Sequence, residues 1–87
     1  MPEISRFFGI IIRIFVRDHL PPHFHAEYSG HEAMISIETG ELLEGTMPRR
    51  ALRLIQDWAE LHKEELKLDF ELLSKGSPDW KPIKPLE

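Results

Sequence analysis

The fold is decided by HFHAEYSGHEAMISIE, residues 23–38, in which apolar and polar side chains alternate on both sides of the pair Ser29-Gly30. Alternation with a period of two predicts strands, and a Ser-Gly pair between two alternating runs predicts a tight hairpin turn. A two-residue turn also sets the register of the hairpin. The expected cross-strand pairs are Tyr28 with His31, Ala26 with Ala33, and Phe24 with Ile35.

Further strands are predicted on both sides of this hairpin. The run GIIIRIFVR, residues 9–17, is rich in β-branched and aromatic residues that suit a pleated surface, with its even-numbered residues on the dry side. Pro21 and Pro22 cannot donate hydrogen bonds to a sheet, so they mark a connection. The pair Thr39-Gly40 is a second, weaker turn signal. We therefore expect an antiparallel meander of about four strands.

The second half of the chain is predicted to be helical. Pro48 suits the first position of a helix, and apolar residues then recur at spacings of three and four up to Ser74. On one straight helix, His62 and Asp69 would lie near the centre of the apolar face, which favours a break near residues 63–65. The predicted fold class is therefore α+β, with one long or two shorter C-terminal helices packed on one face of the sheet.

Length and composition limit the number of domains, the possible chemistry and the expected compartment. The chain has 87 residues, which is enough for one domain, and we expect residues 1–76 to form it and the Pro-rich residues 77–87 to make an extended tail. The absence of Cys excludes disulfides, thiolate zinc sites and thiol catalysis. Apolar runs are too short to span a bilayer and no signal-peptide pattern opens the chain, so we expect a cytoplasmic protein without a membrane partner. The net charge of −4 argues against a surface coated with nucleic acid, but not against a local basic site.

Four of the five His residues lie between His19 and His31. His23 and His25 are two residues apart on a predicted strand, so both imidazoles point to the sheet face that the helices leave uncovered. Imidazole and carboxylate suit zinc, nickel or iron, so His23, His25 and His19 are candidate ligands of a divalent transition metal. Other possible sources of a third ligand are His31, Asp18 and Glu27.

The same residues also suit acid–base catalysis. His titrates near neutral pH and can act as base and acid, so His23, His25 and His19 are candidate catalytic residues of a nuclease-like enzyme. Arg13 and Arg17 are candidate phosphate holders, because a guanidinium binds phosphate through two hydrogen bonds. The alternative is a purely structural cluster, in which each His is satisfied by a nearby carboxylate or backbone carbonyl.

A second candidate site, made of Arg49, Arg50 and Arg53, opens the predicted helix. At the positive end of the helix dipole, such a patch suits an anion or the phosphates of a nucleic acid. The alternative is that these side chains pair with acidic residues such as Glu44 or Asp57. Both interpretations stay open at this point.

Three strings of the chain resemble one family: ISRFFGI at residues 4–10, DHLPPHFHAEY at residues 18–28 and PRRALRLIQDWAELHKEEL at residues 48–66. Together they are similar to a family of small bacterial proteins catalogued as domain of unknown function 4160, over roughly residues 1–75. The string D-H-x-P-P-H-F-H is the most specific part of the likeness. Its matching residues here are Asp18, His19, Pro21, Pro22, His23 and His25.

The resemblance implies a protein from compact two-gene units, often beside domain of unknown function 2442, in a layout similar to toxin–antitoxin modules. We therefore expect a partner-binding component of a toxin–antitoxin-like or regulatory gene pair. Its partner would be a second copy of the chain or a small protein from the neighbouring gene, docked on the uncovered sheet face. Two alternatives remain: a nuclease-like or metal-dependent enzyme that uses His23 and His25, and a nucleic-acid-binding regulator that uses the arginine patch.

Overall fold

A computed structural model describes residues 2–86; Met1 and Glu87, at the ends of the predicted domain and tail, lie outside the described residues. The strands form one antiparallel sheet in the order of the sequence, and two helices follow. The predicted α+β meander is therefore confirmed, with five strands where about four were expected. The elements are β1 (Glu3–Phe7), β2 (Ile10–Arg13), β3 (His23–Tyr28), β4 (His31–Ser36), β5 (Leu42–Gly45), α1 (Arg49–Leu61) and α2 (Lys63–Ser74).

The hairpin of β3 and β4 has the predicted register. Ser29 and Gly30 both have positive φ angles, of 49° and 82°, which is the backbone geometry of the tightest hairpin turns. Phe24 and Ile35 are fully buried on the face toward the helices. The cross-strand pairs include Tyr28 with His31, Ala26 with Ala33, and Phe24 with Ile35, as expected.

The start of the sheet differs from the prediction, which placed a strand over residues 9–17 and none before it. A tight turn at Phe8 and Gly9, whose φ angles are 51° and 80°, folds β1 back onto β2. The ladder then ends before the chain bends at Val16 and Arg17, where Arg17 has a φ of 60°. The prediction that Val16 lies on the dry side of a strand is therefore wrong, and 48% of its surface is exposed.

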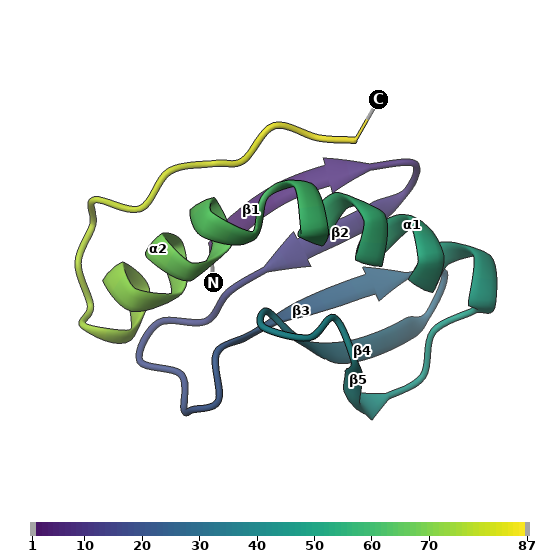
Figure 1. Ribbon diagram of the computed structural model, residues 1–87, viewed down its shortest axis with the longest axis horizontal. Coiled ribbons are helices and arrows are strands. Elements are labelled where there is room, and N and C mark those ends of the chain that lie inside the picture. The colour runs from purple at the N-terminus through teal and green to yellow at the C-terminus, as the bar shows by residue number, and fades with distance from the viewer. Residues whose placement is uncertain (1, 87) are drawn as a thin grey trace.

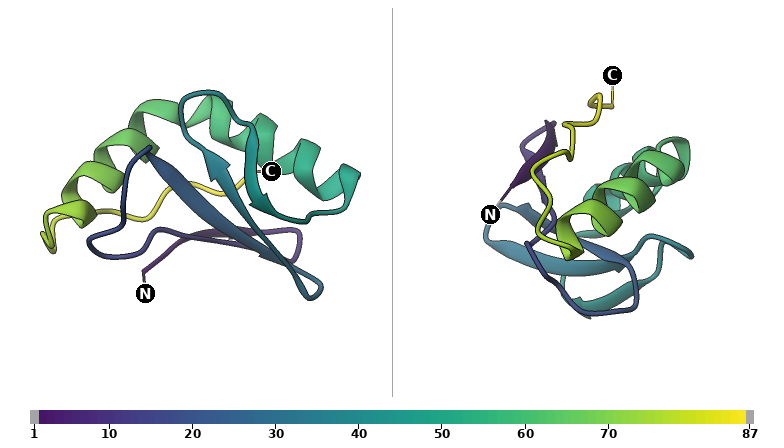
Figure 2. Two further views of the ribbon diagram at one scale, coloured as in Figure 1. Left: turned by 90° about the horizontal axis from the view of Figure 1, so that it is seen from below. Right: turned by 90° about the vertical axis from the view of Figure 1, so that its left-hand side faces the viewer.

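Both helices cover the same face of the sheet (Figures 1 and 2). The chain leaves helical geometry at His62, with φ −117° and ψ 27°, before α2 begins, so of the two predicted alternatives two shorter helices are present, with the break just before the expected residues 63–65. Among residues 2–86, neither helix has the length and apolarity that crossing a membrane requires. The apolar stripe of α1 faces the sheet, and its buried residues are Ala51, Ile55, Trp58 and Ala59.

The C-terminal tail packs against the domain along β1 (Figure 1). Ile83 is only 4% exposed, and its backbone N–H donates a hydrogen bond to the Ile4 carbonyl at 2.9 Å. Trp58, which is fully buried, donates its indole N–H to the Lys84 carbonyl at 2.9 Å. Residues 77–86 form no helix or strand, but they are tied to both layers of the fold.

Candidate functional site

Residues 14–22 connect β2 to β3 and bring several of the predicted site residues together. This loop lies beside the C-terminal end of α2 (Figure 1). The Arg17 N–H donates a hydrogen bond to the Leu73 carbonyl at 2.9 Å, and the Pro22 carbonyl accepts one from the Ile37 N–H at 3.0 Å. Because these bonds reach α2 and the turn after β4, tertiary contacts set the path of the loop.

Asp18, His23 and His25 converge on one point. The Nε2 atom of His23 lies 2.9 Å from Oδ2 of Asp18, and the Nε2 atom of His25 lies 3.1 Å from the same oxygen. The three potential ligand atoms all lie within 4.8 Å of one another. The period of the strand places both imidazoles on one side of β3, and the loop returns the carboxylate to them.

The two imidazoles are buried to different degrees. His23 is fully buried, and its ring packs against Phe70 of α2 with a centroid distance of 5.6 Å. The side chain of His25 is 25% exposed, and its ring packs against Phe15 with a centroid distance of 4.2 Å. The prediction that His23 lies on an uncovered face is therefore wrong, because the loop and α2 close over the start of β3.

The surroundings of Asp18 favour its ionised form. Burial acts to raise the pKa of the carboxyl, but hydrogen bonds from His25 and the His19 amide, together with the charge of the nearby imidazoles, outweigh burial and lower that pKa. The His19 N–H donates to Oδ1 at 2.9 Å, while Oδ2 faces the two imidazoles. The site thus presents an oriented carboxylate.

Both ring nitrogens of His23 face oxygen atoms. Nδ1 is 2.7 Å from the Pro21 carbonyl, which can only accept, so Nδ1 carries a hydrogen. Nε2 faces the carboxylate of Asp18, which is also an acceptor when ionised. Two states satisfy this geometry: an imidazolium that donates from both nitrogens, or a neutral ring whose Nε2 lone pair shares a cation with Asp18.

His19, which the sequence offered as the third ligand, lies at the edge of this cluster. Its Nε2 is 3.8 Å from Oδ1 of Asp18, and its side chain is 66% exposed. Its ring packs near that of His23, with a centroid distance of 5.0 Å. Asp18, rather than His19, therefore completes the close set of three, and His19 faces solvent beside it.

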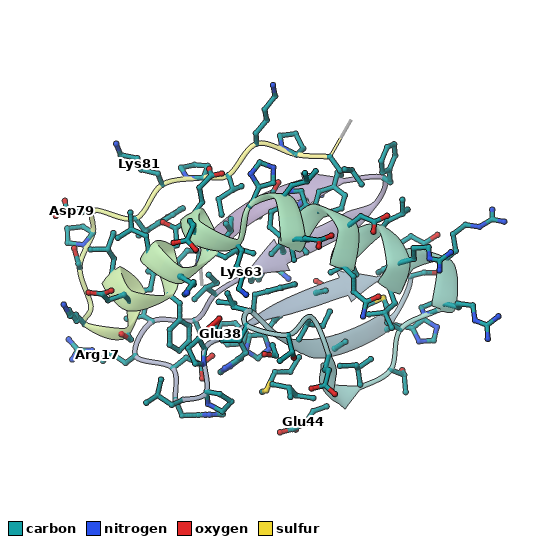
Figure 3. All side chains as sticks on the ribbon, in the orientation of Figure 1. Arg17, Glu38, Glu44, Lys63, Asp79 and Lys81 are labelled. Carbon is teal, nitrogen blue, oxygen red and sulfur yellow. The ribbon has the colours of Figure 1, made fainter. Side chains whose placement is uncertain are left out.

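The arginines expected to hold phosphate do not join the cluster. Arg13 forms an ion pair with Glu27 on the neighbouring strand. Arg17 leaves the sheet at the bend and lies at the end of α2, where a Cβ on Gly76 would be 2.9 Å from its Nη2 (Figure 3). Arg17 does not lie on the sheet beside Arg13, because β2 ends at Arg13. His31, another possible ligand, lies at the far end of the β3–β4 hairpin.

The second predicted patch is separate from the first. Arg49, Arg50 and Arg53 are exposed at the start of α1, and none forms an ion pair with a carboxylate of residues 2–86. The alternative in which Glu44 or Asp57 neutralises them is therefore wrong within the described chain. The start of α1 and the loop of residues 14–22 lie at opposite ends of the molecule (Figure 1).

Two contributions to the cluster were not singled out from the sequence. Phe15 supports the His25 ring, but their contact joins two segments ten residues apart and leaves no local pattern. Asp18 was only one of several possible third ligands. The spacing D-H-x-P-P-H-x-H is the sequence pattern that points to Asp18. Its two prolines end the strand pairing, and the loop that they form brings the carboxylate back to the imidazoles.

The comparison with protein families decides the affiliation of the chain. The family described as Domain of unknown function (DUF4160) matches residues 9–71, more than half of the chain. The chain belongs to this family. The DUF4160 match includes the loop of residues 14–22 and the start of α1, and it is shorter than the resemblance expected over residues 1–75. No match was found among curated proteins or solved structures.

Proposed function

We propose that the protein binds one divalent transition metal ion through Asp18, His23 and His25. The observation that carries this proposal is the convergence of two Nε2 atoms on one carboxylate oxygen, at 2.9 and 3.1 Å. Two imidazoles and a carboxylate form a ligand set that zinc and non-haem iron use in proteins. A cation among these three atoms would replace the contacts between the imidazoles and the carboxylate with bonds to the ion, which requires the lone pair of each Nε2 atom to face it.

The contacts around the three residues support this role. In metal sites, a His ligand usually donates its other ring N–H to a carbonyl or carboxylate, which orients the ring. The Nδ1 atom of His23 makes such a contact with the Pro21 carbonyl at 2.7 Å. Phe70 and Phe15 pack against the two imidazoles, and the His19 amide holds the second oxygen of Asp18. The ligands are thus oriented before any ion binds.

The proposed activity is hydrolytic. With zinc bound, Asp18, His23 and His25 would leave one position for water or substrate, and the ion would lower the pKa of a bound water to about 7. Phe70 closes the His23 side of the cluster, whereas His25 and His19 are the more exposed members. Substrate would therefore approach beside His25, and the His19 imidazole is placed to exchange a proton with solvent.

Metal binding is tested with protein that carries no His tag. The chain is stripped with a chelator, dialysed and titrated calorimetrically with Zn²⁺, and the bound metal is counted by mass spectrometry. We expect one ion per chain. His25→Ala should weaken binding by at least about tenfold, since removing a partner of a metal ligand already costs that much.

His31→Ala is the matched control, because His31 is a half-buried strand His at the other end of the same hairpin. It should bind Zn²⁺ as the unaltered chain does. Asp18→Asn adds a variant of nearly unchanged shape and should also bind weakly. If the unaltered chain binds no stoichiometric metal, or if His25→Ala binds as tightly as His31→Ala, the metal proposal fails.

Partner binding is a second candidate function, favoured by the sheet face that no described helix covers (Figure 2). Met34 on this face is half-buried, and Leu43 on the edge strand β5 is 40% exposed. A second copy, or a small protein from a toxin–antitoxin-like or regulatory gene pair, would bury these side chains. Co-purification with the product of the neighbouring gene, combined with sedimentation of the chain alone, tests this candidate.

Leu43→Lys should reduce such an association. Leu68→Lys, at a residue that is 56% exposed on α2, should leave it unchanged. If the chain sediments as a monomer and does not co-purify with the product of the neighbouring gene, partner binding is contradicted and the metal proposal is unaffected. Growth arrest by either gene alone, relieved by the other, would support the paired role.

A further inference from the structure

We propose that the end of the molecule formed by the β1–β2 turn and the start of α1 binds single-stranded nucleic acid. Two hollows at this end carry the proposal, one apolar and one basic, and Arg50 lines both. The proposal does not rest on the metal centre, because the loop of residues 14–22 lies at the opposite end of the molecule (Figure 1).

The apolar hollow has a volume of about 260 Å³ and contains two aromatic side chains, Phe8 and Tyr28. Phe8 is 60% exposed, and it stands in a turn with a φ of 51°. Gly9 lies close to Tyr28, since a Cβ there would be 3.5 Å from its Cε1. The turn therefore presents an aromatic face to solvent beside an apolar hollow. The remaining lining residues are Ile10, Pro48, Arg50, Ala51 and Leu54.

The basic hollow adjoins it on α1. It has a volume of about 550 Å³ and is lined by Arg49, Arg50 and Arg53, with Leu52 and Gln56. None of the three guanidinium groups pairs with a carboxylate of the described chain, so all three charges remain available to an anion from outside. Arg50 and Arg53 are three residues apart and share one side of the helix.

A nucleotide unit matches both hollows. Its base is a flat group that stacks on aromatic side chains, and its phosphate binds arginine through two hydrogen bonds. In a duplex both faces of a base are covered by its neighbours, so stacking on Phe8 requires an unpaired base. The net charge of −4 does not oppose this, because many of the acidic residues lie away from the start of α1; α2 alone carries Glu64, Glu65, Asp69 and Glu71.

The test uses the full chain and a fluorescent oligothymidylate of about 12 nucleotides, followed by anisotropy at low salt. We expect binding that weakens with salt, with a slope of log K against log salt of about −2 if three phosphates are contacted. Arg50→Glu should lower the affinity by at least about tenfold. Lys81→Glu is the matched charge reversal on the tail, far from the hollows, and should have a much smaller effect (Figure 3).

Phe8→Ala separates stacking from charge. It should lower the affinity for oligothymidylate by about fivefold or more, but it should not change binding to an abasic strand of equal charge. Leu68→Ala is the matched control, because Leu68 is 56% exposed on another surface. Thymidine monophosphate should compete only weakly, which distinguishes a strand from a free nucleotide. Circular dichroism confirms that each variant is folded.

Three outcomes would overturn the proposal. The first is a lack of binding at low salt, and the second is equal affinity of Arg50→Glu and Lys81→Glu. The third is equal affinity for the strand and its duplex, together with an equal effect of Phe8→Ala on intact and abasic strands. This result would mean that the patch binds nucleic acid through non-specific charge alone. None of these outcomes bears on the Zn²⁺ titration.

Discussion

The carboxylate of Asp18 and the imidazole of His23 meet at 2.9 Å, although the ring is fully buried and the carboxylate comes from the preceding loop. This contact joins the loop of residues 14–22 to the start of β3. It also provides the only polar partner of the His23 Nε2 atom among the described residues. The stability of the metal-free chain should therefore depend on it.

Asp18→Ala removes that partner and leaves a buried ring nitrogen unsatisfied. We expect the free energy of unfolding to fall by about 1–3 kcal/mol, the cost of such a group. Urea denaturation of metal-free protein measures the loss. His19→Ala, at a side chain that is 66% exposed, should change stability by less than about 0.5 kcal/mol. Equal stabilities of the two variants would show that the contact contributes nothing.

The tail should contribute to the core through Ile83. This side chain is 4% exposed, so Ile83→Ala should lower the free energy of unfolding by about 2–4 kcal/mol through lost burial and a residual cavity. Lys84→Ala is the control, because it keeps the backbone carbonyl that accepts the Trp58 indole hydrogen bond. Thermal or urea unfolding compares the two. A loss below about 1 kcal/mol for Ile83→Ala would mean that the tail is dispensable.

Asp69 should make stability depend on pH in an unusual direction. Burial raises the pKa of this carboxyl above its ordinary value of 3.8, the Lys81 N–H bond opposes the rise and Glu65 adds to it. The folded state therefore holds the proton to higher pH than the unfolded state, so this group stabilises the fold at acidic pH. That contribution is lost as pH rises through the folded-state pKa.

Asp69→Asn removes this titration and keeps an oxygen that can accept the Lys81 N–H bond. The difference in unfolding free energy, variant minus unaltered chain, should grow between about pH 4 and pH 7. Urea denaturation at several pH values measures it. A difference that stays constant or shrinks toward pH 7 would contradict a raised pKa for Asp69. Asp79→Asn, at an exposed acidic residue, provides the comparison.

Replacing Gly30 and Gly45 by alanine should lower the free energy of unfolding by clearly different amounts. Gly30 and Gly45 have similar positive φ angles, of 82° and 86°, so both variants incur a backbone cost of about 1–2 kcal/mol. A Cβ at Gly45 would also lie 2.1 Å from the Glu32 carbonyl oxygen, whereas nothing lies within 4 Å at Gly30. Gly45→Ala should therefore lower the free energy of unfolding, measured by urea denaturation, by about 2 kcal/mol more than Gly30→Ala does. Equal losses would show that β5 moves away freely.

Local chemistry explains which parts of the fold could be predicted. The register of β3 and β4 follows from the alternation and the Ser29-Gly30 turn, both of which operate over a few residues. The break at His62 was predicted from the polar residues on the apolar face of one straight helix, but Asp69 is buried in the two-helix arrangement as well. β1 and the turn at Phe8 and Gly9 were not predicted, because Phe8 is an unusual residue at a positive φ angle and Phe-Gly is not one of the common hairpin-turn pairs.

The sequence by itself determined that strands precede helices, the main hairpin pairs and the closeness of His23 and His25, because turn chemistry and strand period act locally. Only the tertiary structure decided that Asp18 meets both imidazoles and that His23 is buried. Those outcomes depend on the path of residues 14–22, which α2 holds through the Leu73 carbonyl. Contacts between segments so far apart in the chain are set by packing, and no local pattern encodes them.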